Sequence, residues 1–127
     1  MGPDLWFWVA LVATVVLLVL ALVSGLRGRR RAHLIAGPAA MVSLAIAILL
    51  TEQLAQRYVF PEPVRSIHLW CAKVGGLLAI PVILSGIWLW RRPAVRRLHR
   101  YSVFAFVVAT LVATGTGIWM FSGATLR

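Results

Sequence analysis

Four apolar runs, each long enough to cross a bilayer, constrain this chain more than any other feature of its sequence. They cover roughly residues 5–26, 32–58, 65–90 and 95–122. An α-helix rises about 1.5 Å per residue, so about 20 apolar residues cross a hydrocarbon core of about 30 Å. A soluble fold could not bury so much apolar surface, because the chain has only 127 residues and 61% of them are hydrophobic. The sequence therefore predicts an all-α membrane protein.

The connections between the runs are short, with the sequences RGRRR, VFPEPVR and RRPAVRR. Short connections make consecutive helices antiparallel neighbours. We therefore expect a single transmembrane domain over residues 1–127, folded as a four-helix antiparallel up-and-down bundle. The first run is expected to stay in the protein as a helix, because it lacks the basic segment that precedes the apolar core of a signal peptide.

Arginine is distributed very unevenly along the chain. Nine arginines lie in two short segments, Arg27–Arg31 and Arg91–Arg100. Short basic loops stay in the cytoplasm, so we expect both segments there and both termini on the opposite side. The net charge of +10 then faces anionic lipid headgroups, and nucleic-acid binding is not expected because there is no polar domain to carry it.

Small residues predict which helix faces meet. They recur at every fourth position in the second run (Ala39, Ser43, Ala47, Thr51) and in the fourth run (Ala105, Ala109, Ala113, Gly117). Such spacing lets helix backbones approach closely. The first run is rich in valine and leucine with few small positions, so we expect it to face lipid or other membrane subunits.

Three histidines, His33, His68 and His99, each stand near the start of a helix. The topology places His33 and His99 at the cytoplasmic end of their helices, at similar depth. Two imidazoles facing each other across a bundle core are what a bis-histidine haem iron requires. Other residues suit the same site, since arginines can neutralise haem propionates and a glycine leaves room for the macrocycle; these are Arg31, Arg97, Arg100 and Gly37. Histidine beside arginine at a helix end can also be a simple interfacial residue.

The third and fourth runs share a pattern. His68 is followed after eighteen residues by Gly86-Ile87-Trp88, and His99 after eighteen residues by Gly117-Ile118-Trp119. In antiparallel helices each Gly-Ile-Trp comes to the level of the other helix's histidine. We therefore expect Gly86 and Trp88 near the cytoplasmic histidines, and Gly117 and Trp119 near His68. Interfacial tryptophans and small-residue packing could produce the same match without a ligand.

Other polar residues stand at the opposite ends of the helices, on the side of the membrane where the termini are expected. Glu52 and Gln53 end the second run, while His68 and Lys73 begin the third, at comparable depth. An ionisable residue inside a membrane is a functional hypothesis by default, and a Glu52–Lys73 ion pair would explain both residues without a function. The alternative is a quinone site near Trp119, in which His68 and Lys73 bind a carbonyl oxygen and Glu52 moves protons. A second haem would lack a second histidine, so one haem is expected, and His68 stays open as a further metal ligand.

The pattern resembles the small four-helix membrane cytochromes b of bacteria. The segments that carry the resemblance are RRRAHLIAG, RSIHLWCAKVGG, RRLHRYSVF, LSGIWLWRR and GTGIWMF. The resemblance implies a b-type haem held by His33 and His99, electron exchange with quinone, and a multi-pass location in the bacterial inner membrane with periplasmic termini. The family's two-haem members have four histidines, and this chain has three.

Three other functions remain open. The chain could be a structural subunit of a larger respiratory or photosynthetic membrane complex that binds no cofactor. Its histidines could each ligate one chlorophyll-type pigment, since magnesium takes a single histidine. A small transporter is disfavoured, because only Glu52 and Lys73 could line a path. As a cytochrome, the chain would be the electron-transfer subunit of a membrane oxidoreductase.

Overall fold

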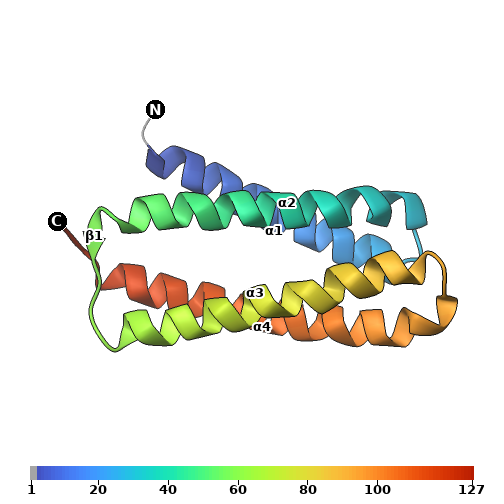
Figure 1. Cartoon of the computed structure of the whole chain (residues 1–127). Helices are drawn as coiled ribbons and strands as arrows, with labels where there is room; N and C mark the ends of the chain where they lie inside the picture. The colour runs from blue at the N-terminus through green and yellow to red at the C-terminus, as the bar shows by residue number, and fades with distance from the viewer. Residues whose placement is uncertain (1–2) are drawn as a thin grey trace. The chain divides into compact units, whose positions relative to one another are not determined.

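The computed structural model describes residues 3–127 and is almost entirely helical (Figure 1). The four long helices are α1 (Pro3–Leu26), α2 (Arg30–Ala55), α3 (Val64–Leu89) and α4 (Arg96–Ser122). A 3₁₀ turn, η1 (Pro93–Val95), precedes α4, and two short strands, β1 (Tyr58–Val59) and β2 (Thr125–Leu126), form a two-stranded ladder. Each long helix is long and apolar enough to cross a membrane, which confirms the predicted fold class.

The helix bounds differ little from those predicted, except at the end of α2. This helix ends at Ala55, whereas the apolar run predicted an end near Tyr58. The backbone of Tyr58 belongs to β1, and the carbonyl of Arg57 accepts a hydrogen bond from the N–H of Arg127 at 3.0 Å. Pairing with the C-terminal segment replaces the last helical turn.

The chain divides into two compact units. Residues 1–58 with Arg127 form the first, and residues 59–126 form the second. Helix α1 packs along α2 in the first unit, and α3 packs along α4 in the second. Both are antiparallel helix pairs, as the short connections predict.

In the first unit, small and hydroxylated residues form the contact between the helices. The Thr14 hydroxyl donates to the carbonyl of Ala10 at 2.7 Å and lies 2.8 Å from Ser43 Oγ, so Ser43 donates to Thr14. Thr14 is only 2% exposed, and Ala40 and Ala47 are buried on α2. The predicted small-residue face of α2 is therefore a packing face, and α1 meets it with its few small residues.

The turn between α1 and α2 is a Schellman motif. Gly28 has a φ of 67°, in the left-handed region that glycine adopts without a steric cost. The N–H of Gly28 donates to Gly25 O at 3.2 Å, and that of Arg29 to Ser24 O at 2.9 Å. These bonds satisfy the last carbonyls of α1, so α2 can begin only three residues after α1 ends.

In the second unit the two backbones approach closely near the middle of the helices. A methyl group built on Gly75 would lie 3.9 Å from the carbonyl oxygen of Ala109. At the end of α4, the rings of Phe60 and Phe121 meet edge to face, with centroids 5.0 Å apart. The predicted role of Ala109 as a contact residue is thus confirmed.

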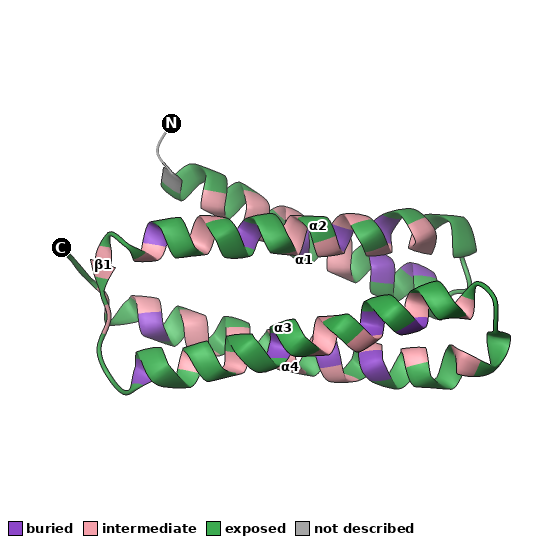
Figure 2. Cartoon of the chain, viewed as in Figure 1, coloured by how far each residue is buried: buried purple, intermediate pink, exposed green. Residues whose placement is uncertain are grey.

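Most of the surface of each helix is exposed apolar side chain (Figure 2). A soluble protein would bury these residues, whereas a bilayer solvates them. The buried polar atoms are all hydrogen-bonded: within residues 3–127 no buried side-chain nitrogen or oxygen lacks a partner. This pattern is what a lipid environment demands, because an unsatisfied polar group there costs several kcal/mol.

Candidate cofactor-binding histidines

The three histidines occupy equivalent places on their helices. His33 and His99 are the fourth residues of α2 and α4, and His68 is the fifth residue of α3. Each side chain is half-buried against the antiparallel partner helix of its own unit. The helix starts therefore place each imidazole at one end of a helix pair, where it meets the last turns of the neighbour.

Within the α3–α4 unit, each histidine meets a hydroxyl group. His99 Nδ1 lies 3.0 Å from Ser85 Oγ, and His68 Nδ1 lies 3.1 Å from Thr116 Oγ1. Both hydroxyls donate to the carbonyl three residues earlier on their own helix, Ser85 to Val82 at 3.3 Å and Thr116 to Ala113 at 3.0 Å. When the hydroxyl hydrogens are used on these carbonyls, the oxygens can accept a bond from Nδ1–H.

A glycine next to each hydroxyl makes room for the imidazole. A methyl group built on Gly86 would lie 3.2 Å from His99 Cε1, and one built on Gly117 would lie 3.1 Å from His68 Cε1. Contacts this short are tighter than ordinary van der Waals separation, so the rings rest directly on the glycine backbones. The predicted meeting of each glycine with the other helix's histidine is confirmed.

The α1–α2 unit contains a third copy of this arrangement, which the sequence reasoning missed. His33 Nδ1 lies 2.8 Å from the carbonyl oxygen of Ala21, and the Ser24 hydroxyl donates to the same carbonyl at 3.1 Å. A methyl group on Gly25 would lie 3.0 Å from His33 Nδ1. Gly25 is the second-last residue of α1 and faces the histidine.

One signal in the sequence could have revealed this third copy. A hydroxyl residue immediately precedes a glycine near the end of three of the four apolar runs, at Ser24-Gly25, Ser85-Gly86 and Thr116-Gly117. In an antiparallel pair, the end of one helix meets the start of the next, where the histidines stand.

The Nδ1 hydrogen bond of His33 defines its tautomer. A carbonyl oxygen can only accept, so His33 donates from Nδ1 to Ala21. With the proton on Nδ1, the neutral ring carries its lone pair on Nε2. The hydroxyl partners of His68 and His99 can donate or accept, so their hydrogen bonds are compatible with the same tautomer. A histidine that donates from one ring nitrogen to the protein and presents the lone pair of the other is the form in which histidine binds metals.

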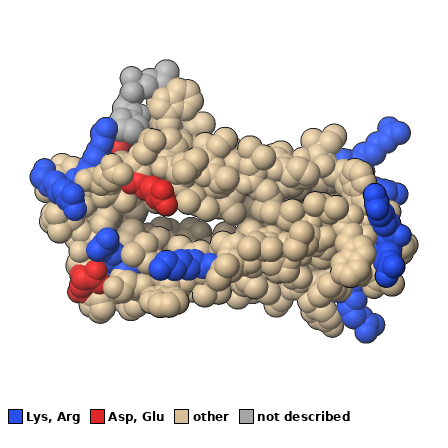
Figure 3. Space-filling view, viewed as in Figure 1, with Lys and Arg blue, Asp and Glu red and all other residues tan. Residues whose placement is uncertain are grey.

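The predicted arginines surround two of the histidines in the chain. Arg31 stands two residues before His33, and Arg97 and Arg100 flank His99; all three side chains are exposed. Figure 3 shows the lysine and arginine side chains on the surface in blue. Gly37 lies one turn after His33, and no atom of the described residues comes within 4 Å of a methyl group built on it.

The tryptophans of the repeated pattern are exposed. Trp88 is 49% exposed, and the Arg92 guanidinium carbon lies 6.0 Å from the centre of its ring. Trp119 is 55% exposed on α4. Such exposure is common for tryptophans at a membrane interface, and the predicted role of both residues at a ligand site stays a prediction.

His33 and His99 belong to different units, so their pairing across one cofactor stays a prediction. The Glu52–Lys73 ion pair and the quinone site also stay predictions. Glu52 and Gln53 are exposed residues of α2 in the first unit, whereas Lys73 belongs to the second unit. The Lys73 ammonium lies 5.3 Å from the centre of the Trp70 ring, three residues earlier on α3.

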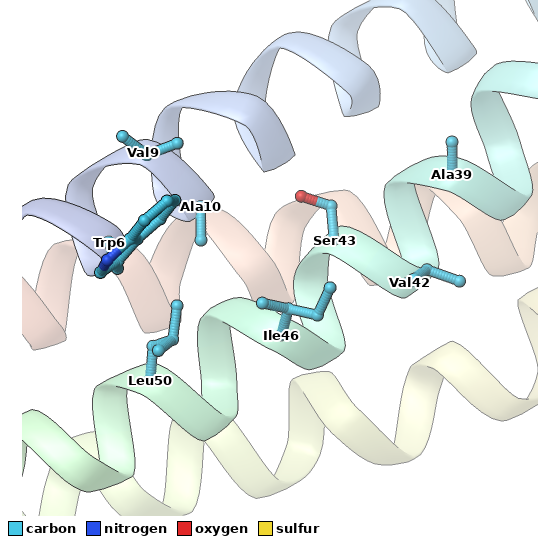
Figure 4. A pocket seen from close by; sticks show the side chains of 8 residues that line it. All are labelled: Trp6, Val9, Ala10, Ala39, Val42, Ser43, Ile46 and Leu50. Carbon is cyan, nitrogen blue, oxygen red and sulfur yellow. The ribbon is translucent and has the colours of Figure 1, made fainter. Parts of the chain in front are cut away.

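A shallow apolar groove of about 480 Å³ lies on the α1–α2 unit (Figure 4). Trp6, Val9 and Ala10 line it from α1, and the remaining lining residues, including Ser43, come from α2. The groove contains none of the predicted site residues and is almost entirely apolar. Such a lining suits a lipid chain, and the histidines remain the candidate site.

No group of three or more histidine, cysteine or acidic side chains within residues 3–127 could hold a metal ion by itself. Comparison with protein-family models, with curated proteins and with solved structures finds no match to this chain.

Proposed function

We propose that this protein is a b-type cytochrome-like subunit of a membrane oxidoreductase, with His33 and His99 as axial ligands of one haem. The observation that carries the proposal is the Nδ1 hydrogen bond of each ring, 2.8 Å to the carbonyl of Ala21 and 3.0 Å to the hydroxyl of Ser85. The carbonyl of Ala21 requires the His33 tautomer with its lone pair on Nε2, and the Ser85 hydroxyl allows the same tautomer for His99; iron binds that lone pair. The donor set of this chain therefore fits haem.

The remaining residues near the two histidines support binding rather than catalysis. Arg31, Arg97 and Arg100 carry positive charge at the helix ends, where haem propionates would need it. Gly25 and Gly86 let the rings rest against the partner helix, which restricts their rotation. When bound, haem supplies one-electron chemistry, and the partner in electron exchange is a quinone or another subunit.

Reduced-minus-oxidised absorption spectra of the purified protein test the proposal directly. We expect the sharp bands of a low-spin haem upon reduction with dithionite. His33→Ala and His99→Ala should each abolish those bands, while His68→Ala should keep them. Absence of the bands after expression with ample haem would contradict the proposal and favour a structural subunit without cofactor. The spectrum of a magnesium chlorin would favour a pigment-binding subunit.

The proposal includes an orientation in the bacterial inner membrane. Only four basic side chains lie outside the two arginine-rich segments, whereas nine arginines lie within them, and short basic loops stay cytoplasmic. The excess favours cytoplasmic α1–α2 and α3–α4 loops and periplasmic termini. A C-terminal alkaline phosphatase fusion should be active and a fusion after Arg92 inactive; the reverse result would invert the topology.

A further inference from the structure

The two helix pairs repeat one arrangement, so each position of α3 can be compared with its counterpart on α1. In both units a Ser-Gly dipeptide lies against a histidine of the partner helix, at Ser24-Gly25 in α1 and at Ser85-Gly86 in α3. The same spacing of 61 residues relates Thr14 to Gly75, and both are buried where the two helices of their unit touch. A residue of α3 therefore corresponds to the residue 61 positions earlier.

Lys73 departs from this repeat. It is the only lysine of the chain, and its side chain is exposed in the first half of α3. Its counterpart on α1 is Val12, which is 58% exposed. A valine therefore suffices for the fold at this position. A charged residue there is costly inside a membrane, and an ionisable residue in such a place is a functional hypothesis by default.

Two exposed tryptophans place Lys73 close to a boundary of the hydrocarbon core. Trp70 and Trp90 are 68% and 67% exposed, and the twenty residues between them correspond to about 30 Å of helix, the thickness of that core. Tryptophans gather at both boundaries of a membrane core. Lys73 stands three residues, or about 5 Å, inside the boundary that Trp70 marks. Helical side chains point toward the start of their helix, and the Lys73 ammonium accordingly lies 5.3 Å from the centre of the Trp70 ring.

The ammonium of Lys73 has three N–H donors that the protein does not use. Within residues 3–127 it forms no hydrogen bond and no ion pair. On the same face of α3, Val74 and Leu77 are 49% and 65% exposed and continue as apolar surface toward the membrane centre. A positive charge at the boundary with apolar surface below it matches a phospholipid, whose phosphate lies above its acyl chains.

We propose that Lys73 and Trp70 bind the phosphodiester group of a phospholipid, at the end of the α3–α4 unit where α3 begins. The ammonium donates to the phosphate oxygens, and the acyl chains lie along Val74 and Leu77. The α1–α2 unit has no such site, because Val12 carries no charge. The site does not involve the histidines, so it is independent of the proposed function.

Native mass spectrometry of the full-length protein, released from detergent micelles that contain phosphatidylglycerol, tests this inference. Lys73→Val copies the residue of the first unit and should weaken lipid binding about fivefold, the factor for one basic residue at a membrane surface. Lys73→Arg should retain binding. Arg65→Gln is the matched control on the same helix, because its charge already pairs with Glu62 at 3.6 Å. Unchanged binding in Lys73→Val, or an equal loss in Arg65→Gln, would overturn the inference.

Two further measurements separate the phospholipid from other partners of the lysine. Glycerophosphoglycerol, the same headgroup without acyl chains, should not displace the lipid; displacement at equal concentration would show that the site takes a soluble phosphodiester instead. Lys73→Val should also unfold at the same fraction of sodium dodecyl sulfate as the wild type, because Val12 occupies the equivalent position. Equal and non-additive losses of stability in Lys73→Val and Glu52→Gln would identify Glu52 as the partner and overturn the inference.

Discussion

Gly86 is the residue at which the packing of a histidine against the partner helix can be measured most directly. Gly86→Ala would place a methyl group 3.2 Å from His99 Cε1 and 3.6 Å from Nδ1. The ring must then move by a few tenths of an ångström, and the 3.0 Å bond to Ser85 lengthens. Overpacking costs about 1–3 kcal/mol and a weakened hydrogen bond about 0.5–1 kcal/mol.

Alanine also favours the helix over glycine by about 1 kcal/mol, which partly offsets these costs. Gly76→Ala on the same helix receives this gain alone, because its methyl group meets no described atom within 4 Å. The gain cancels in the comparison, so we expect Gly86→Ala to be less stable than Gly76→Ala by about 1.5–4 kcal/mol, the sum of the overpacking and hydrogen-bond costs. Equilibrium unfolding by sodium dodecyl sulfate in mixed micelles, followed by circular dichroism, measures the difference.

A double-mutant cycle identifies the cause of the difference. In a His99→Ala background the ring is absent, so Gly86→Ala should cost no more than Gly76→Ala. Equal stabilities of Gly86→Ala and Gly76→Ala in the wild-type background would refute the contact. A penalty that persists without His99 would show that another neighbour of Gly86 is responsible.

Three more outcomes follow from contacts within the two units. Thr14→Val and Ser43→Ala should each destabilise the α1–α2 pair by about 0.5–1.5 kcal/mol and should not be additive, since both remove one hydrogen bond; additive unfolding free energies would argue against that bond. Gly28→Ala should cost about 1 kcal/mol in the same assay, because its φ of 67° is unfavourable for alanine; a neutral result would show that the turn adopts another conformation. Gly123→Ala places a methyl group 2.9 Å from Pro61 Cγ and should lower the thermal midpoint, which a rise would contradict.

The fold class was predictable because lipid imposes a simple rule. A run of about 20 apolar residues has to become a helix in a bilayer, and short loops make neighbouring helices antiparallel. The end of α2 was not predictable in this way. Tyr58 and Val59 have side chains that could extend the apolar run, but their strand pairs with Thr125 and Leu126, far away in the sequence.

The site was predictable only in part. The eighteen-residue spacing of His68 to Gly86 and of His99 to Gly117 predicted that each glycine would meet a histidine, and this is confirmed. The hydrogen bond from His33 to the carbonyl of Ala21 could not be predicted from side-chain types, because every residue has a backbone carbonyl group. The pairing of His33 with His99 depends on how the two units pack, which no residue pattern within either unit determines.

The two histidine contacts of the α3–α4 unit also fix the sliding position of one helix along the other. They lie at opposite ends of the unit, separated by eighteen residues, or about 27 Å of helix. Apolar side chains discriminate weakly between alternative alignments in lipid, because each alignment offers similar contacts. A shift of α4 by one turn would remove His99 from Gly86 and His68 from Gly117 at the same time. The two imidazole contacts therefore favour one alignment of α3 with α4, and they do so without a bound ligand.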